Sequence, residues 1–209
     1  MKKFVIAAIF LVFGSLSAFA EGLYFDVGLG LGKGWTKIGG VDMSKDLKAH
    51  STGSVSQTTI DLGLKLGYGP FGDIPLYIVG ELGGIGHRFS VGSEHLQFNS
   101  YIFGPGVIYY PMPLIQLGAS LGYSWIANQT NASDPNTKSL KDLKSKSGYA
   151  YNLYGAIDLG ESNHGCLIGL KYFYAKNKLK YEGTSLGIDQ KQSMISVFAR
   201  YAFRHKDND

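Results

Sequence analysis

The stretch LYFDVGLGLG, residues 23–32, alternates large apolar side chains with small or polar ones. One parity holds Leu23, Phe25, Val27, Leu29 and Leu31, and the other holds Tyr24, Asp26 and three glycines. Because neighbouring side chains of a strand point to opposite faces, this pattern predicts a β-strand with one apolar face. A soluble sandwich strand with its apolar face packed inward has the same pattern, so this stretch alone leaves both architectures open.

Seven further segments repeat the alternation. They cover residues 60–68, 76–88, 97–110, 115–125, 149–159, 166–174 and 195–203. Eight strands of about ten residues, each long enough to cross a bilayer when tilted, leave no room for a second domain. The segment 97–110 is apolar on both parities, so its two faces stay unassigned.

The connections between these segments alternate between long and short. The long ones are 36–54, 89–96, 127–147 and 176–191, and the short ones are 69–75, 111–113 and 160–165. Long loops on one side and short turns on the other are typical of outer-membrane barrels, whose even strand number places both termini beside the short turns. Aromatic residues at the strand ends, among them Tyr109, Tyr110 and Trp125, fit the girdles of such a barrel.

Composition narrows the class of protein. The chain has 209 residues, 44% of them hydrophobic and 17% charged, which excludes a disordered protein. Its 29 glycines stand beside 14 tyrosines and 12 phenylalanines, a mixture that favours sheet, and their spacing of two excludes collagen. The single cysteine, Cys166, excludes a disulfide scaffold and a thiolate zinc cluster, and we expect it to be a small apolar side chain.

Residues 1–20 have the form of a secretory signal peptide. A basic start at Lys2 and Lys3 precedes an apolar run, and Ala18-Phe19-Ala20 matches a signal-peptidase site. The apolar run is shorter than the ~20 residues that a membrane-spanning helix needs. We therefore expect cleavage after residue 20, a barrel over residues 21–203 and a short polar tail over residues 204–209. The leader, the loops and the aromatic strand ends together favour a membrane barrel over a soluble one.

Two stretches resemble small outer-membrane barrels of the OmpX/Ail and OmpW kind. QSMISVFARYAF, residues 192–203, ends on an aromatic residue preceded by apolar residues at alternate positions. YIFGPGVIY, residues 101–109, is followed by a tight turn and by LGASLGY, residues 117–123. The resemblance implies an eight-stranded antiparallel up-and-down transmembrane barrel in the outer membrane of a diderm bacterium. The tail departs from the pattern, because in this group the final aromatic residue usually ends the chain.

The resemblance also implies a terminal assembly signal read by the barrel-assembly machinery. Its residues here are Val197, Ala199, Tyr201 and Phe203. For function, it implies adhesion, serum resistance or envelope integrity in the Ail-like branch, and passage of small hydrophobic compounds in the OmpW-like branch. We expect the first, with a channel or transporter for hydrophobic compounds as the alternative.

Seven charged residues within the strands lie on the parity opposite the aliphatic one. They are Asp26, Asp61, Lys65, Glu81, Asp158, Lys171 and Arg200. An eight-stranded barrel is just wide enough to be filled by side chains, and unpaired buried charges are costly, so these residues should pair inside the barrel. The first and last strands become neighbours on closure, which predicts an ion pair between Asp26 and Arg200.

The long loops are rich in lysine. The basic residues singled out are Lys138, Lys141, Lys144, Lys146, Lys176, Lys178 and Lys180. A basic rim attracts anionic lipid heads, glycosaminoglycans or acidic host proteins, although it also serves solubility alone. We expect outer-membrane lipid and a host or anionic surface ligand as partners, a monomer, and neither nucleic acid nor a cofactor.

Two catalytic or cofactor interpretations are weaker. His87, Ser90 and Glu94 lie near the predicted outer rim, where some eight-stranded barrels modify lipids, but their spacing does not match the His-x-Ser pattern of the deacylases. The glycine run 28–34 has Lys33 and Trp35 where a dinucleotide fingerprint requires glycine. We therefore expect no enzyme, with a lipid-modifying enzyme as a second alternative, and no metal site.

Overall fold

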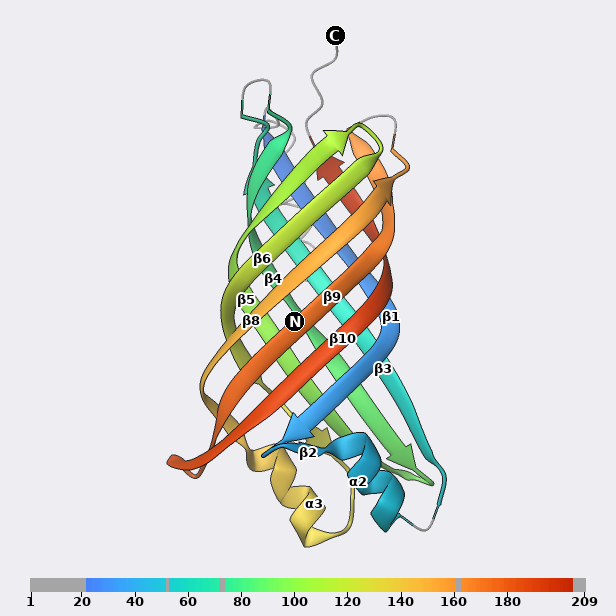
Figure 1. Cartoon of the computed structure of the whole chain (residues 1–209), viewed down its shortest axis with the longest axis vertical. Coiled ribbons are helices and arrows are strands. Elements are labelled where there is room, and N and C mark those ends of the chain that lie inside the picture. Colours follow the sequence, from blue (N-terminus) through green and yellow to red (C-terminus); the bar gives the residue numbers. More distant parts are fainter. Residues whose placement is uncertain (1–21, 52, 72–73, 161–162, 205–209) are drawn as a thin grey trace, which may run out of the picture.

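The computed structural model describes residues 22–51, 53–71, 74–160 and 163–204, and within them the chain forms an antiparallel barrel (Figure 1). Its long strands are β1 (Leu23–Ile38), β3 (Val55–Tyr68), β4 (Leu76–Val91), β5 (Glu94–Met112), β6 (Ile115–Ile126), β8 (Lys144–Asp158), β9 (His164–Tyr181) and β10 (Thr184–Arg204). Each long strand pairs with the next, and β10 pairs with β1, which closes the ring. The expected eight-stranded fold is confirmed. The predicted signal peptide, residues 1–20, lies outside the described residues.

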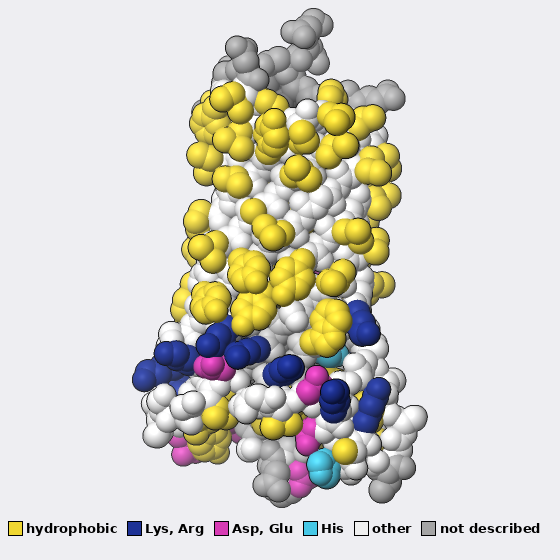
Figure 2. Space-filling model, in the orientation of Figure 1, with side chains coloured by type: hydrophobic (Ala, Val, Ile, Leu, Met, Phe, Trp, Pro, Cys, Tyr) yellow, Lys and Arg dark blue, Asp and Glu magenta, His cyan; other side chains and the backbone are white. Residues whose placement is uncertain are grey.

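The apolar parity of the strands faces outward. Leu31, Leu62 and Leu170 have 58%, 58% and 62% of their surface exposed, whereas Asp26, Lys65 and the other strand charges on the opposite parity are buried. Figure 2 shows hydrophobic side chains covering the wall of the barrel, with charged side chains gathered at one end. This arrangement is that of a lipid-facing barrel, and it excludes the soluble architecture with an apolar core.

The segment whose faces were unassigned, β5, is apolar on both sides for two different reasons. Phe103 and Val107 face outward into the hydrophobic band, while Ile102 and Ile108 are fully buried in the barrel core. Tyr110 was predicted to belong to the aromatic girdle, and that prediction is wrong. Its ring is only 7% exposed and points inward, because its hydroxyl group takes part in the interior hydrogen bonds described below.

The ends of the barrel differ. The start of β1, the end of β10 and the short turns lie at one end, the turn end, which faces the periplasm in barrels of this architecture. At the other end, the loop end, two short helices lie across the opening, α2 (Met43–His50) and α3 (Pro135–Ser139). The short strands β2 (Val41–Asp42) and β7 (Gln129–Thr130) and the 3-10 helix η2 (Leu140–Asp142) lie in the same loops. No helix among the described residues is long and apolar enough to cross a membrane.

The loop expected over residues 176–191 is instead a hairpin. β9 and β10 continue past the membrane and are joined at Glu182 and Gly183, which both have positive φ angles of 48° and 86°. Positive φ at both central residues is the signature of a type I′ hairpin turn, which follows the natural twist of the strands. β10 also extends one residue beyond the expected end of the barrel, to Arg204.

Candidate functional site

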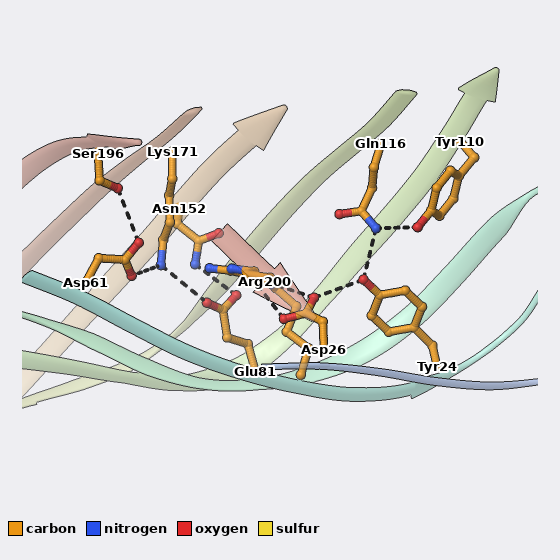
Figure 3. Close-up of polar contacts among 11 residues, drawn as sticks. Tyr24, Asp26, Asp61, Glu81, Tyr110, Gln116, Asn152, Lys171, Ser196 and Arg200 are labelled. Atoms are coloured by element: carbon orange, nitrogen blue, oxygen red, sulfur yellow. Dashed lines mark hydrogen bonds and ion pairs between the residues drawn. The ribbon is translucent and has the colours of Figure 1, made fainter. Parts of the chain in front are cut away.

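A cluster of buried charges occupies the middle of the barrel (Figure 3). The Asp26 carboxylate lies 3.3 Å from the Lys65 ammonium group and 3.2 Å from the Arg200 guanidinium group. The Tyr24 hydroxyl donates a 2.9 Å hydrogen bond to the same carboxylate. One aspartate therefore holds two buried cations, and the structure brings together the Asp26 and Arg200 side chains that strand closure was expected to pair.

A second group of charges continues this cluster toward the loop end. Lys171 donates a 2.7 Å hydrogen bond to Asp61 and lies 3.8 Å from Glu81. Asn152 donates to the other Glu81 oxygen at 2.9 Å, and Ser196 donates to Asp61 at 3.2 Å. These neutral donors occupy carboxylate lone pairs that the cations do not, so the buried acids are hydrogen-bonded as well as paired.

The turn end is filled by a third group. The Gln116 side chain donates to the hydroxyl groups of Tyr24 at 2.9 Å and Tyr110 at 2.6 Å. Tyr110 in turn donates to Asp158 at 3.1 Å, and Asp158 forms an ion pair with Arg204. Arg204 had been assigned to the tail, although it continues the inward parity of Arg200 and supplies the base that balances four acids with four bases.

Between the charges and the loop end, an apolar layer and then an amide layer occupy the lumen. The apolar layer consists of Ile85, Ile102, Ala150, Phe173, Ala175 and Met194. In the amide layer, Gln192 donates to Thr36 at 3.3 Å and Gln190 donates to Gln192 at 3.1 Å. Met43 of α2 then packs on Phe89, Leu96 and Phe98 at the loop end. Together with the charge cluster, these layers follow one another along the described lumen.

His87, the histidine considered for catalysis, points into the barrel. Its Nδ1 atom lies 3.0 Å from the Thr36 hydroxyl oxygen, and its ring lies against Phe89 with centroids 4.2 Å apart. The pleat of β4 turns Ser90 to the opposite face, and Glu94 accepts a 2.9 Å hydrogen bond from the Ser133 backbone. The structure therefore does not bring these three predicted rim residues together.

The lysines at the loop end form an ordered arrangement. Lys37, Lys191 and Lys176 lie directly opposite one another on the neighbouring strands β1, β10 and β9, and we call them the lysine row. Asp189 lies 3.1 Å from Lys176, and its hydrogen bond raises the pKa of that ammonium group. On the face drawn in Figure 2, Lys and Arg side chains gather at this end of the barrel just beyond the hydrophobic band.

The other predicted basic residues divide between the hairpins and the helical cap. Lys144 lies opposite Lys180 in the β8–β9 pairing, and Lys178 lies opposite Asp189 across β10. Lys146 is exposed on β8. Lys138 belongs to α3 and Lys141 to η2. The lysine row also includes Lys37 and Lys191, and their alignment depends on a strand register that cannot be read from the chain.

The predicted assembly residues lie on the outward face of the final strand. Val197, Ala199, Tyr201 and Phe203 pair with Leu31, Leu29, Val27 and Phe25 of β1. Val197 and Tyr201 are 59% and 47% exposed. They therefore line the seam at which the barrel closes, and their role as an assembly signal stays a prediction.

No family model matches the chain, and no curated protein matches it. It is similar in structure to Ail, the attachment invasion locus protein of Yersinia pestis, solved with the heparin analogue sucrose octasulfate, at 13% identity and a TM-score of 0.49 over 88% of this chain and 99% of Ail. OprG from Pseudomonas aeruginosa has 14% identity and a TM-score of 0.44, covering 89% and 98% of the two chains. The outer membrane enzyme PagL has 14% identity and a TM-score of 0.45, covering 86% and 99%. The likeness concerns the fold alone, and these neighbours are small outer-membrane barrels of the group that the sequence resembles.

Proposed function

We propose that this protein is a closed, non-enzymatic outer-membrane barrel whose lysine row binds phosphate or sulfate groups at the cell surface, in adhesion or in maintaining the envelope. The observation that carries the proposal is the register of Lys37, Lys191 and Lys176, which sets three ammonium groups side by side on adjoining strands. The row lies two residues beyond Trp35 and Tyr174, at the level where polar groups begin.

Like charges directly opposite each other on neighbouring strands destabilise a sheet. Asp189 is the acid that the structure places against the row, and it leaves a net positive charge there. The pair of Lys144 and Lys180 repeats the arrangement on the adjoining hairpin. An anion with several phosphate or sulfate groups would offset this repulsion across more than one strand. Lysines that serve only solubility do not need to be aligned on neighbouring strands.

The barrel interior supports a role outside the lumen. The buried charges are paired, and the apolar and amide layers above them lie across the path of a solute. His87 is turned inward, away from a lipid substrate at the outer wall. These features favour a surface-binding function over transport or lipid modification.

The lysine row can be tested with charge-neutral variants. We expect the triple substitution Lys37→Gln, Lys176→Gln and Lys191→Gln to weaken binding of the detergent-folded protein to immobilised heparin about tenfold, because three exposed ionic contacts are lost together. The affinity is measured from binding isotherms at fixed ionic strength, since exposed charges are screened by salt.

A matched control removes three lysines from the helical cap instead. The substitutions Lys45→Gln, Lys48→Gln and Lys138→Gln change the net charge by the same amount but leave the strand register of lysines intact. We expect this triple to bind heparin with nearly the affinity of the unsubstituted protein. Equal weakening by the two triples would show a response to net charge alone and would contradict the lysine row as the binding surface.

A further inference from the structure

A groove with a volume of about 580 Å³ lies on the outer wall of the barrel, mainly over β3, β4 and β5, with residues of β1 and β6 at its edges. Ile60, Leu62 and Leu82 line the apolar part of the groove and are each about half exposed, so this part opens on the lipid-facing band. Gly84 and Gly86 of β4 lie on the same outward face and form its floor. The groove is thus a depression in the apolar outer wall.

The side chains of Tyr101 and Asn99 in β5 lie close to the two glycines. A Cβ atom on Gly84 would lie 2.8 Å from the Tyr101 ring, and one on Gly86 would lie 2.8 Å from the Asn99 side-chain oxygen. The Tyr101 ring stacks on Trp125, with centroids 5.3 Å apart, and both residues line the groove. Glycine at these positions therefore lets side chains of β5 approach the β4 backbone closely. It also leaves the space beside Leu62 and Leu82 open.

The end of the groove nearer the loop end of the barrel is polar. Gln97 donates a 2.8 Å hydrogen bond to Asn99, and Asn99 donates a 2.6 Å hydrogen bond to the Ala127 carbonyl oxygen. Arg88 lies directly opposite Gln97 in the β4–β5 pairing, is exposed, and shares the outward face of Gly84 and Gly86. Its other register partner is Thr58, so neither strand neighbour offers it an acid. Both Arg88 and Gln97 lie beyond the aromatic pair formed by Tyr101 and Trp125.

We propose that this groove is a binding site for a phosphorylated lipid of the outer leaflet, with one acyl chain beside Ile60, Leu62 and Leu82 and the phosphate at Arg88 and Gln97. The order of the chemistry along the groove is that of such a lipid: an apolar chain, then the aromatic interface, then a phosphate. A guanidinium group is suited to this role because it binds phosphate through two parallel hydrogen bonds. The volume falls within the range of small-molecule sites, about 300–1,000 Å³.

Trp125 supplies a probe inside the groove. The Trp35→Phe variant leaves Trp125 as the single tryptophan of the barrel, since the chain has two. This protein is folded into phosphatidylcholine vesicles that contain a small fraction of dibrominated phosphatidic acid or, separately, dibrominated phosphatidylcholine. We expect the brominated phosphatidic acid to reach half-maximal quenching at about tenfold lower mole fraction, because its free phosphate monoester forms stronger charge-assisted hydrogen bonds than the phosphodiester of phosphatidylcholine, whose charge choline neutralises.

Three variants in this background test the two ends of the groove. Gly86→Leu fills the floor and meets mainly flexible atoms of Asn99 and Gln97, so we expect it to remove the tenfold preference. Arg88→Gln should also remove the preference while leaving ordinary quenching by both lipids. Gly155→Leu is the matched control, because Gly155 is an outward glycine of β8 whose nearest neighbour is a Leu117 side-chain atom at 3.5 Å, and it should keep the preference.

Two outcomes would overturn the proposal. One is equal quenching by the two brominated lipids, which is the result expected if Trp125 contacts only the bulk lipid around the barrel. The other is an Arg88→Gln variant that keeps the preference for phosphatidic acid. Arg88 is exposed, so this variant keeps the test valid even if Gly86→Leu does not fold, and the heat-dependent mobility of each variant on SDS gels reports its folding.

Discussion

Replacing Asp26 by alanine is expected to lower the free energy of unfolding by about 3–5 kcal/mol, since a buried ion pair loses one partner. The Asp26 carboxylate lies 3.3 Å from Lys65 and 3.2 Å from Arg200, and all three side chains are buried. The substitution leaves two cations close together in the barrel without the anion they share. Urea unfolding in detergent micelles, followed by tryptophan fluorescence, measures the loss.

Asp189→Ala is the control for this variant, because it also removes an aspartate from an ion pair. Asp189 lies 3.1 Å from Lys176, but the two side chains keep 27% and 31% of their surface exposed. Solvent screens an exposed pair of this kind, so we expect only a small change in the free energy of unfolding. If Asp26→Ala were no more destabilising than Asp189→Ala, the buried cluster would not be what stabilises the barrel interior.

Gly28→Val is expected to hinder closure of the barrel and to lower the ratio of folded to unfolded protein by at least about tenfold, as overpacking at a rigid site does. A Cβ atom at Gly28 would lie 2.2 Å from the Ala199 carbonyl oxygen and 2.6 Å from the Arg200 Cα atom. Both are backbone atoms of β10, which pairs with β1 at the closing seam. The backbone cannot withdraw without breaking the pairing, so loss of the heat-sensitive folded band on SDS gels is the expected result.

Gly80→Val is the corresponding control in β4. Gly80 faces outward, and the nearest atom to its added Cβ would be the Leu66 carbonyl oxygen at 3.8 Å, an ordinary contact. Valine suits a strand facing lipid, so this variant should keep the folded band. A Gly28→Val protein that folds as well as Gly80→Val would show that the close approach at the seam is not required.

Alternation of side chains predicts the strands and their faces because a lipid-facing barrel needs one apolar face on every strand. It fails for β5, where Ile102 and Ile108 are apolar on the inward side as part of the core. Tyr110 was misplaced for the same reason, since an aromatic ring suits a girdle and a core equally well. Its partner Asp158 was known to face inward, but the hydrogen bond between them depends on strand register.

The loop end was the least predictable part. Asp42 accepts hydrogen bonds from the backbone of Ser44 and Lys45, and Asp134 precedes Pro135, so both helices begin with capping signals that are visible in the chain. The turn at Glu182 and Gly183 gave a weaker signal, because Asn or Asp is the usual residue before the glycine. The lysine row depends on which residues of β1, β9 and β10 lie opposite one another, and no local pattern fixes that register.

Single-channel recording of the full-length protein in planar lipid bilayers tests most directly whether the lumen is closed. The charge cluster around Asp26, the apolar layer around Phe173 and the helix α2 above them lie in succession along the barrel axis. We predict insertion of folded protein, verified by its heat-dependent gel mobility, without steady conductance steps. Reproducible steps of one defined size would contradict a filled barrel and would favour a channel in place of the surface-binding function proposed for the lysine row.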